Sequence, residues 1–524
     1  MKKNYKIMVM VLVMVLSGMG FADAQRIVKI SGWDVAADPS GDPDTYNNQL
    51  YDAINADSTL RKTDPNVIYE LKRNHLYVLG KRIENRDYKL HIRAEAGEGM
   101  LPEVIVGKTV AGGYGEDYIR AYNDITLENI AFNGHTPEGG VLNRMIEVFG
   151  AKARFEVLGC AMDGDRGGFI VPQADSMTII IKNSVFGNSG HRVSYGGNGR
   201  LIDFRPDAKY IDTCIVENST VYNITDRIIR NQGSQVNYLK IDHITVLNNT
   251  GVHGCIQLGN VKTASVTNSV FGNAISLGHS AYRTNEQLQD DKHFAVITLD
   301  SIWTSGQTIT IRNNNIYNDQ ELVDVWAKYD SVESPNALCA TTKQAIGSAN
   351  LSAAAFSEPL VFKTICGPIS DYVDAYYTNP ASATFPENWC VGGQDGYFYD
   401  QIDVSYANTY QSYTAADNGK PVGSLLNFGP LSSLRSPKTS NPKVSVYPNP
   451  AFGKANFGFV LETPAIVRIT VFDITGSQVK LVANSFMGAG THNVEFDGSM
   501  LPSGVYYYSL EAGPGITNGK MVLY

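Results

Sequence analysis

A strand-and-turn pattern occurs seven times between Ile125 and Asn318, and it restricts the chain to a repetitive architecture. In each copy an aliphatic residue stands two places before a central position, and an apolar residue stands three places after it. Such columns indicate that equivalent side chains stack on one another in one continuous core. The central position holds Asn129, Gly159, Asn183, Asn218, His243, Asn268 and Asn313.

These central positions are 30, 24, 35, 25, 25 and 45 residues apart, so the basic unit has about 24 or 25 residues and some units carry insertions. A unit this short, rich in β-branched residues and broken by Asn and Gly, is typical of one coil of a solenoid. A second column supports this interpretation, because isoleucine recurs at one strand position of six segments. These residues are Ile146, Ile170, Ile202, Ile229, Ile256 and Ile297.

The first 24 residues have the pattern of a secretory signal peptide. Lys2 and Lys3 begin a basic start, Ile7 to Leu16 form an apolar stretch, and Ala22-Asp23-Ala24 is a cleavage site. The apolar stretch is too short to span a bilayer, and no later segment reaches the roughly 18 apolar residues that a span needs. We therefore expect an exported mature chain without a transmembrane segment.

The net charge of −9 argues against a nucleic-acid partner, because such binding needs concentrated basic charge. The six cysteines are too few for a disulfide scaffold. Cys214 and Cys255 fall in apolar columns and are expected to be buried small hydrophobes. Cys339, Cys366 and Cys390 lie in an irregular region where one bridge could form.

Composition divides the chain into five parts. Residues 25–120 are expected to hold an N-terminal cap, with a helix near Tyr46 to Asp57, and the first coils. Residues 121–431 are expected to form the solenoid with an irregular C-terminal coil or cap. Residues 432–442 read as a linker, and 443–524 as a small β-sandwich, after the signal peptide at 1–24.

The last of these parts resembles the type A sorting domain of the type IX secretion system. The matching elements, in order, are VSVYPNPA, VRITVFDITG, GAGTHNVEFD, LPSGVYYYSL and the final GKMVLY. The resemblance implies that the type IX machinery is a partner and that the protein reaches the outer cell surface or the medium. The alternative is an ordinary β-sandwich that binds sugar or packs on the solenoid.

The solenoid resembles the right-handed parallel β-helix of pectate-lyase-like proteins, whose turns carry an asparagine ladder. The fold class implied is all-β, a right-handed parallel β-helix followed by a small β-sandwich. The opening of the chain is similar to the chondroitinase B and alginate lyase group. That group's pair of acidic calcium ligands followed by a basic residue is missing here, so its catalytic residues are not carried over. The stretch Asp400 to Phe428 resembles the end of many surface β-helix proteins from bacteria with type IX secretion.

Insertions fall between the two strand types of a coil, at His135 to Asn143, Ser189 to Asn198 and Ser276 to His293. Solenoid insertions at one point of the repeat lie on one side and border the binding face. Period-two alternation turns the column after the isoleucines outward onto that face. The predicted substrate-binding residues are Arg144, Glu147, Tyr195, Gln257, Tyr282 and Arg283.

The candidate catalytic residues are Arg200, Asp203, Arg205, Arg227, Arg230, His191 and His279. The arginines come from two adjacent coils and could cradle a uronate, since guanidinium groups bind carboxylates bidentately. The alternative is a structural ion-pair ladder with Asp203 between Arg205 and Arg230. The histidines decorate the longer insertions, where they could act as a general base.

A hydrolase of this fold would need two or three carboxylates that converge on one sugar. The set that comes closest to this requirement is Asp163, Asp165 and Asp203. No cofactor is predicted, although Asp163 with Asp165, or Asp290 with Asp291, would supply oxygen ligands for Ca²⁺. Two functions remain open. One is a noncatalytic surface protein that contacts polysaccharide, and the other is an enzyme acting on acidic polysaccharide, a lyase in preference to a hydrolase.

Overall fold

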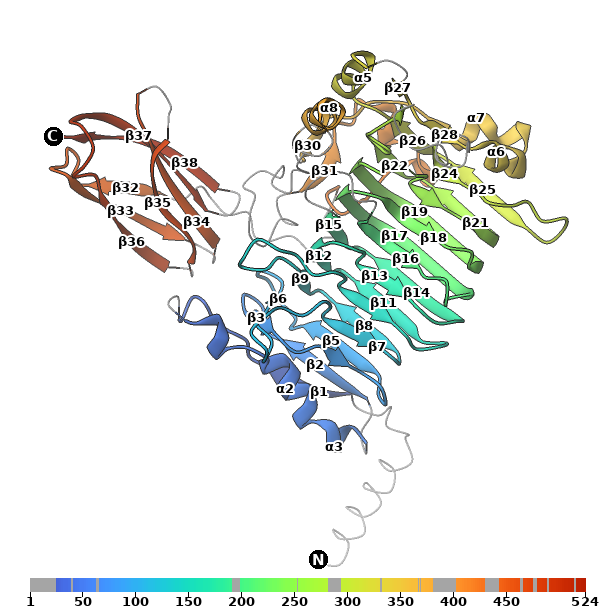
Figure 1. Ribbon diagram of the computed structural model, residues 1–524, viewed down its shortest axis with the longest axis horizontal. Coiled ribbons are helices and arrows are strands. Elements are labelled where there is room, and N and C mark those ends of the chain that lie inside the picture. Colours follow the sequence, from blue (N-terminus) through green and yellow to red (C-terminus); the bar gives the residue numbers. More distant parts are fainter. Residues whose placement is uncertain are drawn as a thin grey trace, which may run out of the picture.

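The computed structural model describes residues 25–38, 41–62, 66–190, 198–251, 253–280, 294–329, 332–365, 367, 369–379, 402–428, 443–461, 465–474, 478–487, 490–512 and 515–524. The expected signal peptide and linker lie outside these residues. The chain is mostly β, with two large parallel sheets followed by small antiparallel sheets near the C-terminus (Figure 1).

The larger parallel sheet contains 18 strands in the part of the chain that the structure describes. They are β1 (Arg26–Ile30), β2 (Val67–Leu71), β3 (Leu76–Leu79), β5 (Leu90–Ala94), β6 (Glu103–Val106), β8 (Ile125–Glu128), β9 (Ala131–Asn133), β11 (Arg154–Leu158), β12 (Ala161–Asp165), β14 (Met177–Lys182), β15 (Val185–Ser189), β17 (Tyr210–Ile224), β19 (Gln235–Asn249), β21 (Asn260–Thr267), β22 (Val270–Gly272), β25 (Thr308–Arg312), β26 (Asn314–Tyr317) and β29 (Ala355–Phe356).

The register of this sheet confirms both apolar columns of the repeat. Each strand pairs in parallel with the equivalent strand of the next repeat, as Leu127 does with Val157 and Phe132 with Met162. The columns begin earlier than the sequence alignment shows, because Ile92 pairs with Leu127 and Val104 with Phe132. The side chains of these columns join one buried core. The chain therefore buries its apolar residues by stacking repeat on repeat.

The seven central residues adopt a left-handed backbone, with φ between 47° and 64°. Asn and Gly tolerate this conformation best, which explains their recurrence. The amide of Asn129 donates to Leu158 O, and that of Gly159 to Lys182 O, so each turn is tied to the next repeat. A second left-handed column follows five residues later at Asn188, Asn223, Asn248 and Asn273.

The second parallel sheet has nine strands among the described residues. Its isoleucine column is confirmed by the pairing of Ile146 with Ile170 and of Ile229 with Ile256. The column extends upstream to Ile119 and Ile83. The strands are β4 (Ile83–Glu84), β7 (Ile119–Ala121), β10 (Ile146–Val148), β13 (Ile170–Pro172), β16 (Arg200–Phe204), β18 (Arg227–Asn231), β20 (Ile256–Gln257), β24 (Ala295–Thr298) and β28 (Asn336–Leu338).

A helix packs on the core near the N-terminus, as the sequence predicts. This helix, α2 (Gln49–Ala56), buries Leu50 and Ile54. It begins later than expected because Asn48 takes a left-handed backbone and its side chain accepts from the amides of Gly80 and Lys81. The other helical segments among the described residues are η1 (Pro43–Thr45), α3 (Ser58–Arg61), α5 (Gln320–Ala327), α6 (Ala340–Ile346), η3 (Ser348–Asn350), α7 (Leu351–Ala354), α8 (Ser370–Thr378), η5 (Gln411–Tyr413) and η6 (Asp417–Gly419).

The irregular segment after the repeats folds back over the larger sheet. Residues 402–428, which we call the strap, place Val404, Tyr406 and Val422 in a buried apolar cluster with Tyr222 and Leu247 of that sheet. Three short pairings accompany this region: β26 with β29, β30 (Phe362–Thr364) with β31 (Asp403–Tyr406), and β23 (His279–Ser280) with β27 (Val332–Glu333). The strap therefore covers part of the outer side of the stack.

The cysteines are buried thiols where the structure describes them. Cys214 and Cys255 lie in the core, as expected, and burial raises the pKa of each thiol to about 12. Cys339 is buried and free, so it forms no bridge. Cys366 and Cys390, its suggested partners, fall outside the described residues.

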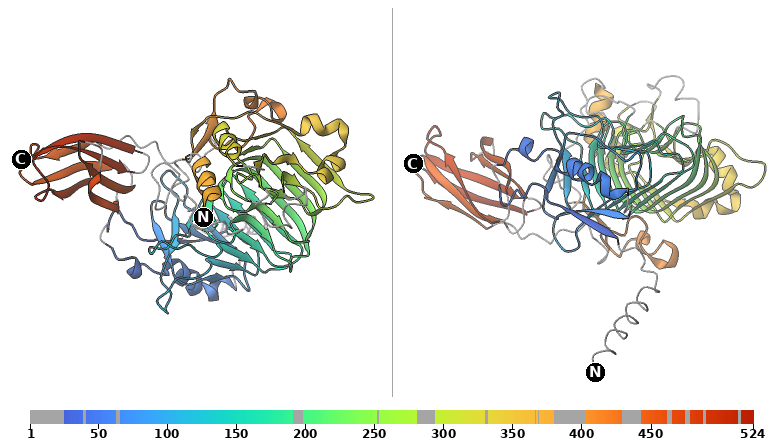
Figure 2. Two further views of the ribbon diagram at one scale, coloured as in Figure 1. Left: turned by 45° about the horizontal axis from the view of Figure 1, so that its top comes forward. Right: turned by 90° about the horizontal axis from the view of Figure 1, so that it is seen from below.

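The C-terminal module forms a body separate from the stacked strands, coloured red in Figure 2. Two antiparallel sheets share one apolar core, whose residues lie between Ala451 and Leu523. The strands are β32 (Val444–Tyr447), β33 (Lys454–Leu461), β34 (Ala465–Phe472), β35 (Gln478–Met487), β36 (Gly490–Asp497), β37 (Gly504–Ala512) and β38 (Gly515–Leu523).

Candidate functional site

The outer side of the nine-stranded sheet carries a column of residues, each directly after an isoleucine of the core, that is mostly polar and is interrupted by Val171. Parallel pairing aligns Glu84 with Arg120, Arg120 with Glu147, and Asp203 with Arg230. Alternation along the strands turns these side chains away from the apolar core. We call this column, together with the arginines beside it, the charged face.

Four arginines surround two carboxylates at the centre of the charged face. Asp203 Oδ1 accepts from Arg230 Nε at 2.6 Å, and its Oδ2 accepts from Arg205 Nη1 at 3.3 Å. Asp226 accepts from Arg200 Nε at 2.6 Å and from Arg227 Nε at 3.0 Å. Arg200 also reaches Asp203 at 3.5 Å, which links the two groups. The sequence analysis predicted that five of these six residues lie close together, and it did not include Asp226.

Burial decides the electrostatics of this cluster. The side chains of Asp203 and Asp226 are 2% and 0% exposed, whereas that of Arg205 is 33% exposed. Burial lowers the pKa of Arg230, and the neighbouring Asp203 opposes that shift. Buried charges must be paired, and among the described residues the carboxylates that contact these four guanidinium groups are Asp203 and Asp226. Asp203 does lie between Arg205 and Arg230, which is the arrangement of an ion-pair ladder.

A second, balanced cluster continues the charged face toward the N-terminus. Arg120 Nε lies 3.0 Å from Asp117 and 3.1 Å from Glu147. Glu147 also accepts from Arg144 and, at 2.5 Å, from Gln173 Nε2. Burial raises the pKa of Asp117, against the pull of the nearby arginines.

Asp117 and Arg120 were missed by sequence reasoning. Arg120 had a signal, because the segment Ile119–Ala121 repeats the strand pattern of Ile146–Val148. Asp117 shared this signal, because it stands two residues before Ile119 as Arg144 stands two residues before Ile146.

An aromatic pair borders this cluster. The rings of Tyr122 and Phe149, which follow β7 and β10, stack with centroids 5.4 Å apart and planes 16° apart. The guanidinium carbon of Arg86 lies 3.9 Å from the centre of the Tyr122 ring. Half-buried aromatic rings beside hydrogen-bonding groups are suited to sugar rings, which have apolar faces and polar edges.

The structure describes only some of the remaining predicted residues. Gln257 Oε1 accepts from Arg227 Nη1 at 2.9 Å, so Gln257 joins the charged face. His279 lies in the short strand β23. The other four, His191, Tyr195, Tyr282 and Arg283, fall outside the residues that the structure describes.

The carboxylates considered for hydrolysis or calcium have other partners. Asp163 Oδ1 lies 2.8 Å from His135 Nε2, and its Oδ2 accepts from Asn188 at 2.9 Å. Asp165 accepts from Ser189 Oγ and the amide of Gly168, and burial raises its pKa to about 7. Within the described ranges no three acidic, histidine or cysteine side chains are placed to hold a metal ion. Asp290 and Asp291 lie outside those ranges.

Comparison with known proteins identifies one part of the chain. Residues 445–524 match the family described as secretion system C-terminal sorting domain. The match supports the resemblance of this module to sorting domains, and it indicates export by the type IX secretion system. A search of curated proteins and a search of solved structures each return no match. Among the described residues, no helix is both long and apolar enough to cross a membrane.

Proposed function

Since residues 445–524 match a secretion sorting domain, we propose that the rest of the chain is its exported cargo, a β-helix that binds acidic polysaccharide through the charged face. In this proposal the cargo binds the polymer without cleaving it. Delivery to the cell surface or the medium places the charged face where extracellular polysaccharides occur.

The right-handed parallel β-helix is part of this proposal. Its support is the parallel register of two sheets, in which every repeat pairs with the next. The left-handed turns with stacked asparagines add to it, since Asn218 Nδ2 donates to Asn183 Oδ1 at 2.7 Å. The likeness to pectate-lyase-like proteins rests on the same ladder.

The four arginines around Asp203 and Asp226, which outnumber the carboxylates they contact among the described residues, carry the functional proposal. Strands of neighbouring repeats lie about 4.8 Å apart, so the charged groups on adjacent repeats are closely spaced on either side of Val171. A linear polymer with regularly spaced carboxylates can meet several of these groups together. Arg205 is the most exposed of the four arginines and has only one guanidinium contact to Asp203, which leaves donors for a ligand carboxylate.

Binding is favoured over cleavage by the state of the carboxylates. A lyase needs a base that can accept the proton next to the uronate carboxylate. Asp203 and Asp226, at the centre of the charged face, are each held by two or more arginines. Their oxygens already accept from guanidinium groups, and the two side chains are only 2% and 0% exposed, so neither carboxylate is placed to take a proton from a substrate.

The test measures binding of the purified protein to immobilised polygalacturonate, alginate and glycosaminoglycans. We expect Arg205→Ala to weaken binding to the preferred polymer about tenfold, the effect of losing one charge-assisted contact. Arg154→Ala is the matched control, because Arg154 is exposed on the other sheet and pairs with Glu156. Unchanged binding by Arg205→Ala with an intact fold would refute the proposal. A rise in the ultraviolet absorbance of unsaturated uronates would instead assign a lyase.

A further inference from the structure

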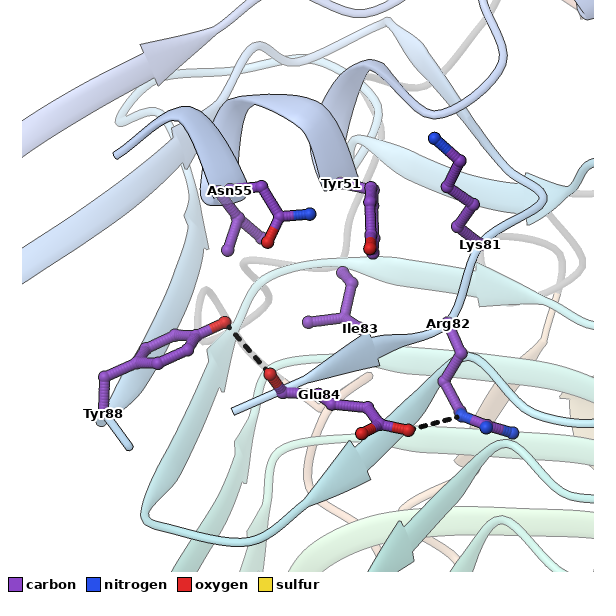
Figure 3. A pocket seen from close by; sticks show the side chains of 8 residues that line it. Tyr51, Asn55, Lys81, Arg82, Ile83, Glu84 and Tyr88 are labelled. Carbon is purple, nitrogen blue, oxygen red and sulfur yellow. Dashed lines mark hydrogen bonds and ion pairs between the residues drawn. The ribbon is translucent and has the colours of Figure 1, made fainter. Parts of the chain in front are cut away.

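A separate pocket of about 370 Å³ opens between α2 and β4 (Figure 3). This volume is at the small end of the range, about 300–1,000 Å³, that is usual for small-molecule sites. Three lining residues come from the helix and five from β4 and the chain around it. The lining consists of Tyr51, Ile54, Asn55, Lys81, Arg82, Ile83, Glu84 and Tyr88.

The pocket combines an apolar floor with two tyrosine walls. Ile54 and Ile83 are buried members of the core. Tyr51 and Tyr88 are half-buried, and the guanidinium carbon of Arg61 lies 3.9 Å from the centre of the Tyr88 ring. Burial raises the pKa of Tyr88 to about 12, so its hydroxyl stays protonated near neutral pH and donates to Glu84 O at 3.5 Å. This lining is suited to a pyranose ring.

The charges of the lining point to an acidic sugar. Lys81 Nζ lies 5.0 Å from the centre of the Tyr51 ring, and its side chain is 40% exposed. Its ion pair with Asp52, at 3.6 Å, lies at the surface, where such pairs contribute little free energy. Lys81 can therefore exchange Asp52 for a ligand carboxylate. Arg82, by contrast, is engaged by Glu84 and Asp117.

The pocket borders the charged face. Glu84 lines the pocket and also begins the polar column, where it aligns with Arg120. Arg82 contacts Glu84 at 3.2 Å and Asp117 at 3.0 Å, so it joins the two sites. In the described part of the chain, β4 is the edge strand at the N-terminal end of its sheet. The pocket thus lies at one end of the charged face.

We propose that this pocket binds the terminal uronate of the polysaccharide, with the sugar ring against Tyr51 and Tyr88 and its carboxylate on Lys81. The inference rests on the proposed function for the identity of the polymer. The pocket itself is complete for a single sugar, so a free uronic acid occupies it without the rest of the chain.

The experiment follows saturation-transfer NMR of the purified protein with free galacturonate, glucuronate and mannuronate. We expect binding of at least one uronate, and no binding of its methyl ester or of the neutral sugar. Lys81→Met should weaken uronate binding about tenfold. Lys89→Met is the matched control, because Lys89 is exposed, pairs with Asp124 and is not part of the lining.

Two results would overturn the inference: no uronate binds, or Lys81→Met binds as well as the parent. Equal binding of the methyl ester would overturn it too, since the carboxylate would then have no role. Arg205→Ala separates the two sites, because it should weaken polymer binding and leave the free uronate bound. A parent protein that binds the free uronate but none of the polymers would count against the charged face alone.

Discussion

His243 occupies one of the seven left-handed turns, at φ 52°, where five others carry asparagine. Its Nδ1 lies 3.2 Å from Asp242 Oδ1, while its Nε2 is buried and has no hydrogen-bond partner within the described residues. An unpaired buried nitrogen costs free energy that an asparagine at this turn would not incur. The side chain of an asparagine would also be placed to join the ladder.

We therefore predict that His243→Asn raises the free energy of unfolding by about 1 kcal/mol. His243→Ala should lower it by about 1 kcal/mol, because alanine tolerates a left-handed backbone less well. Urea denaturation of both variants and the parent measures the difference. A less stable His243→Asn protein would contradict this account of the turn.

Asp165 is a fully buried carboxylate. Burial raises its pKa from the ordinary value of 3.8 to about 7. Between these two values the folded protein keeps a proton that the unfolded chain has released. The free energy of unfolding must therefore fall as the pH rises through this interval, and the favourable contribution is lost above about pH 7.

Replacing Asp165 with Asn should remove this dependence. We expect the parent to lose more stability between pH 5 and pH 8 than Asp165→Asn does, as measured by urea denaturation at both values. Asp87→Asn, a change at an exposed carboxylate, should behave like the parent. Equal slopes for the parent and Asp165→Asn would show that Asp165 titrates outside this window.

At the scale of elements, backbone amides of the strap donate hydrogen bonds to side-chain oxygens of the repeats. The amide of Ser424 donates to Thr245 Oγ1 at 2.8 Å, that of Leu425 to Asn218 Oδ1 at 2.6 Å, and that of Asp417 to Asn268 Oδ1 at 3.0 Å. Asp417 also pairs with Arg312 at 2.6 Å. The asparagine ladder thus binds the strap as well as its own turns.

Thr245→Val tests the attachment of the strap. Valine keeps the shape of threonine, but it leaves the buried amide of Ser424 without an acceptor, which should cost about 1–3 kcal/mol. Amide hydrogen exchange at residues 423–426 should accelerate, and the free energy of unfolding should fall. Thr245→Ser, which keeps the hydroxyl, is the control for exchange at Ser424. Unaltered exchange in Thr245→Val would mean that packing alone holds the strap.

Elements that recur were predictable, because period and column can be read from one sequence. The pairing of Leu127 with Val157 and the turn at Asn183 follow from such columns. The strap was not predictable in this way, since Leu425 has no counterpart in another repeat. The charged face was found only where arginines recur in register, so the partnership of Arg82 with Asp117 was missed.

At the scale of the whole molecule, the sorting domain has a core of its own. Its buried residues, from Ala451 to Leu523, form a cluster distinct from that of the stacked repeats. The match to secretion sorting domains begins at residue 445. The stacked repeats and the module that directs export are therefore different parts of the chain, each with its own core.

We predict that a chain lacking residues 443–524 folds but is not exported. Expressed in a bacterium with the type IX system, it should stay in the periplasm, as cell fractionation would show. Its circular dichroism and protease resistance should match those of the repeats in the full chain. Export of the shortened chain would contradict the assignment of the signal to this domain.

The hydrogen bond between Leu425 and Asn218 joins residues 207 positions apart. A ribosome makes the chain from its N-terminus, and early parts begin to fold before later ones exist. The middle repeats can stack while the strap is still unmade, and the side-chain oxygens of Asn218 and Thr245 then lack their donors from the strap. Only a chain translated as far as Leu425 can supply them. The strap thus distinguishes finished chains from interrupted ones, and prematurely ended products keep an open, protease-accessible flank.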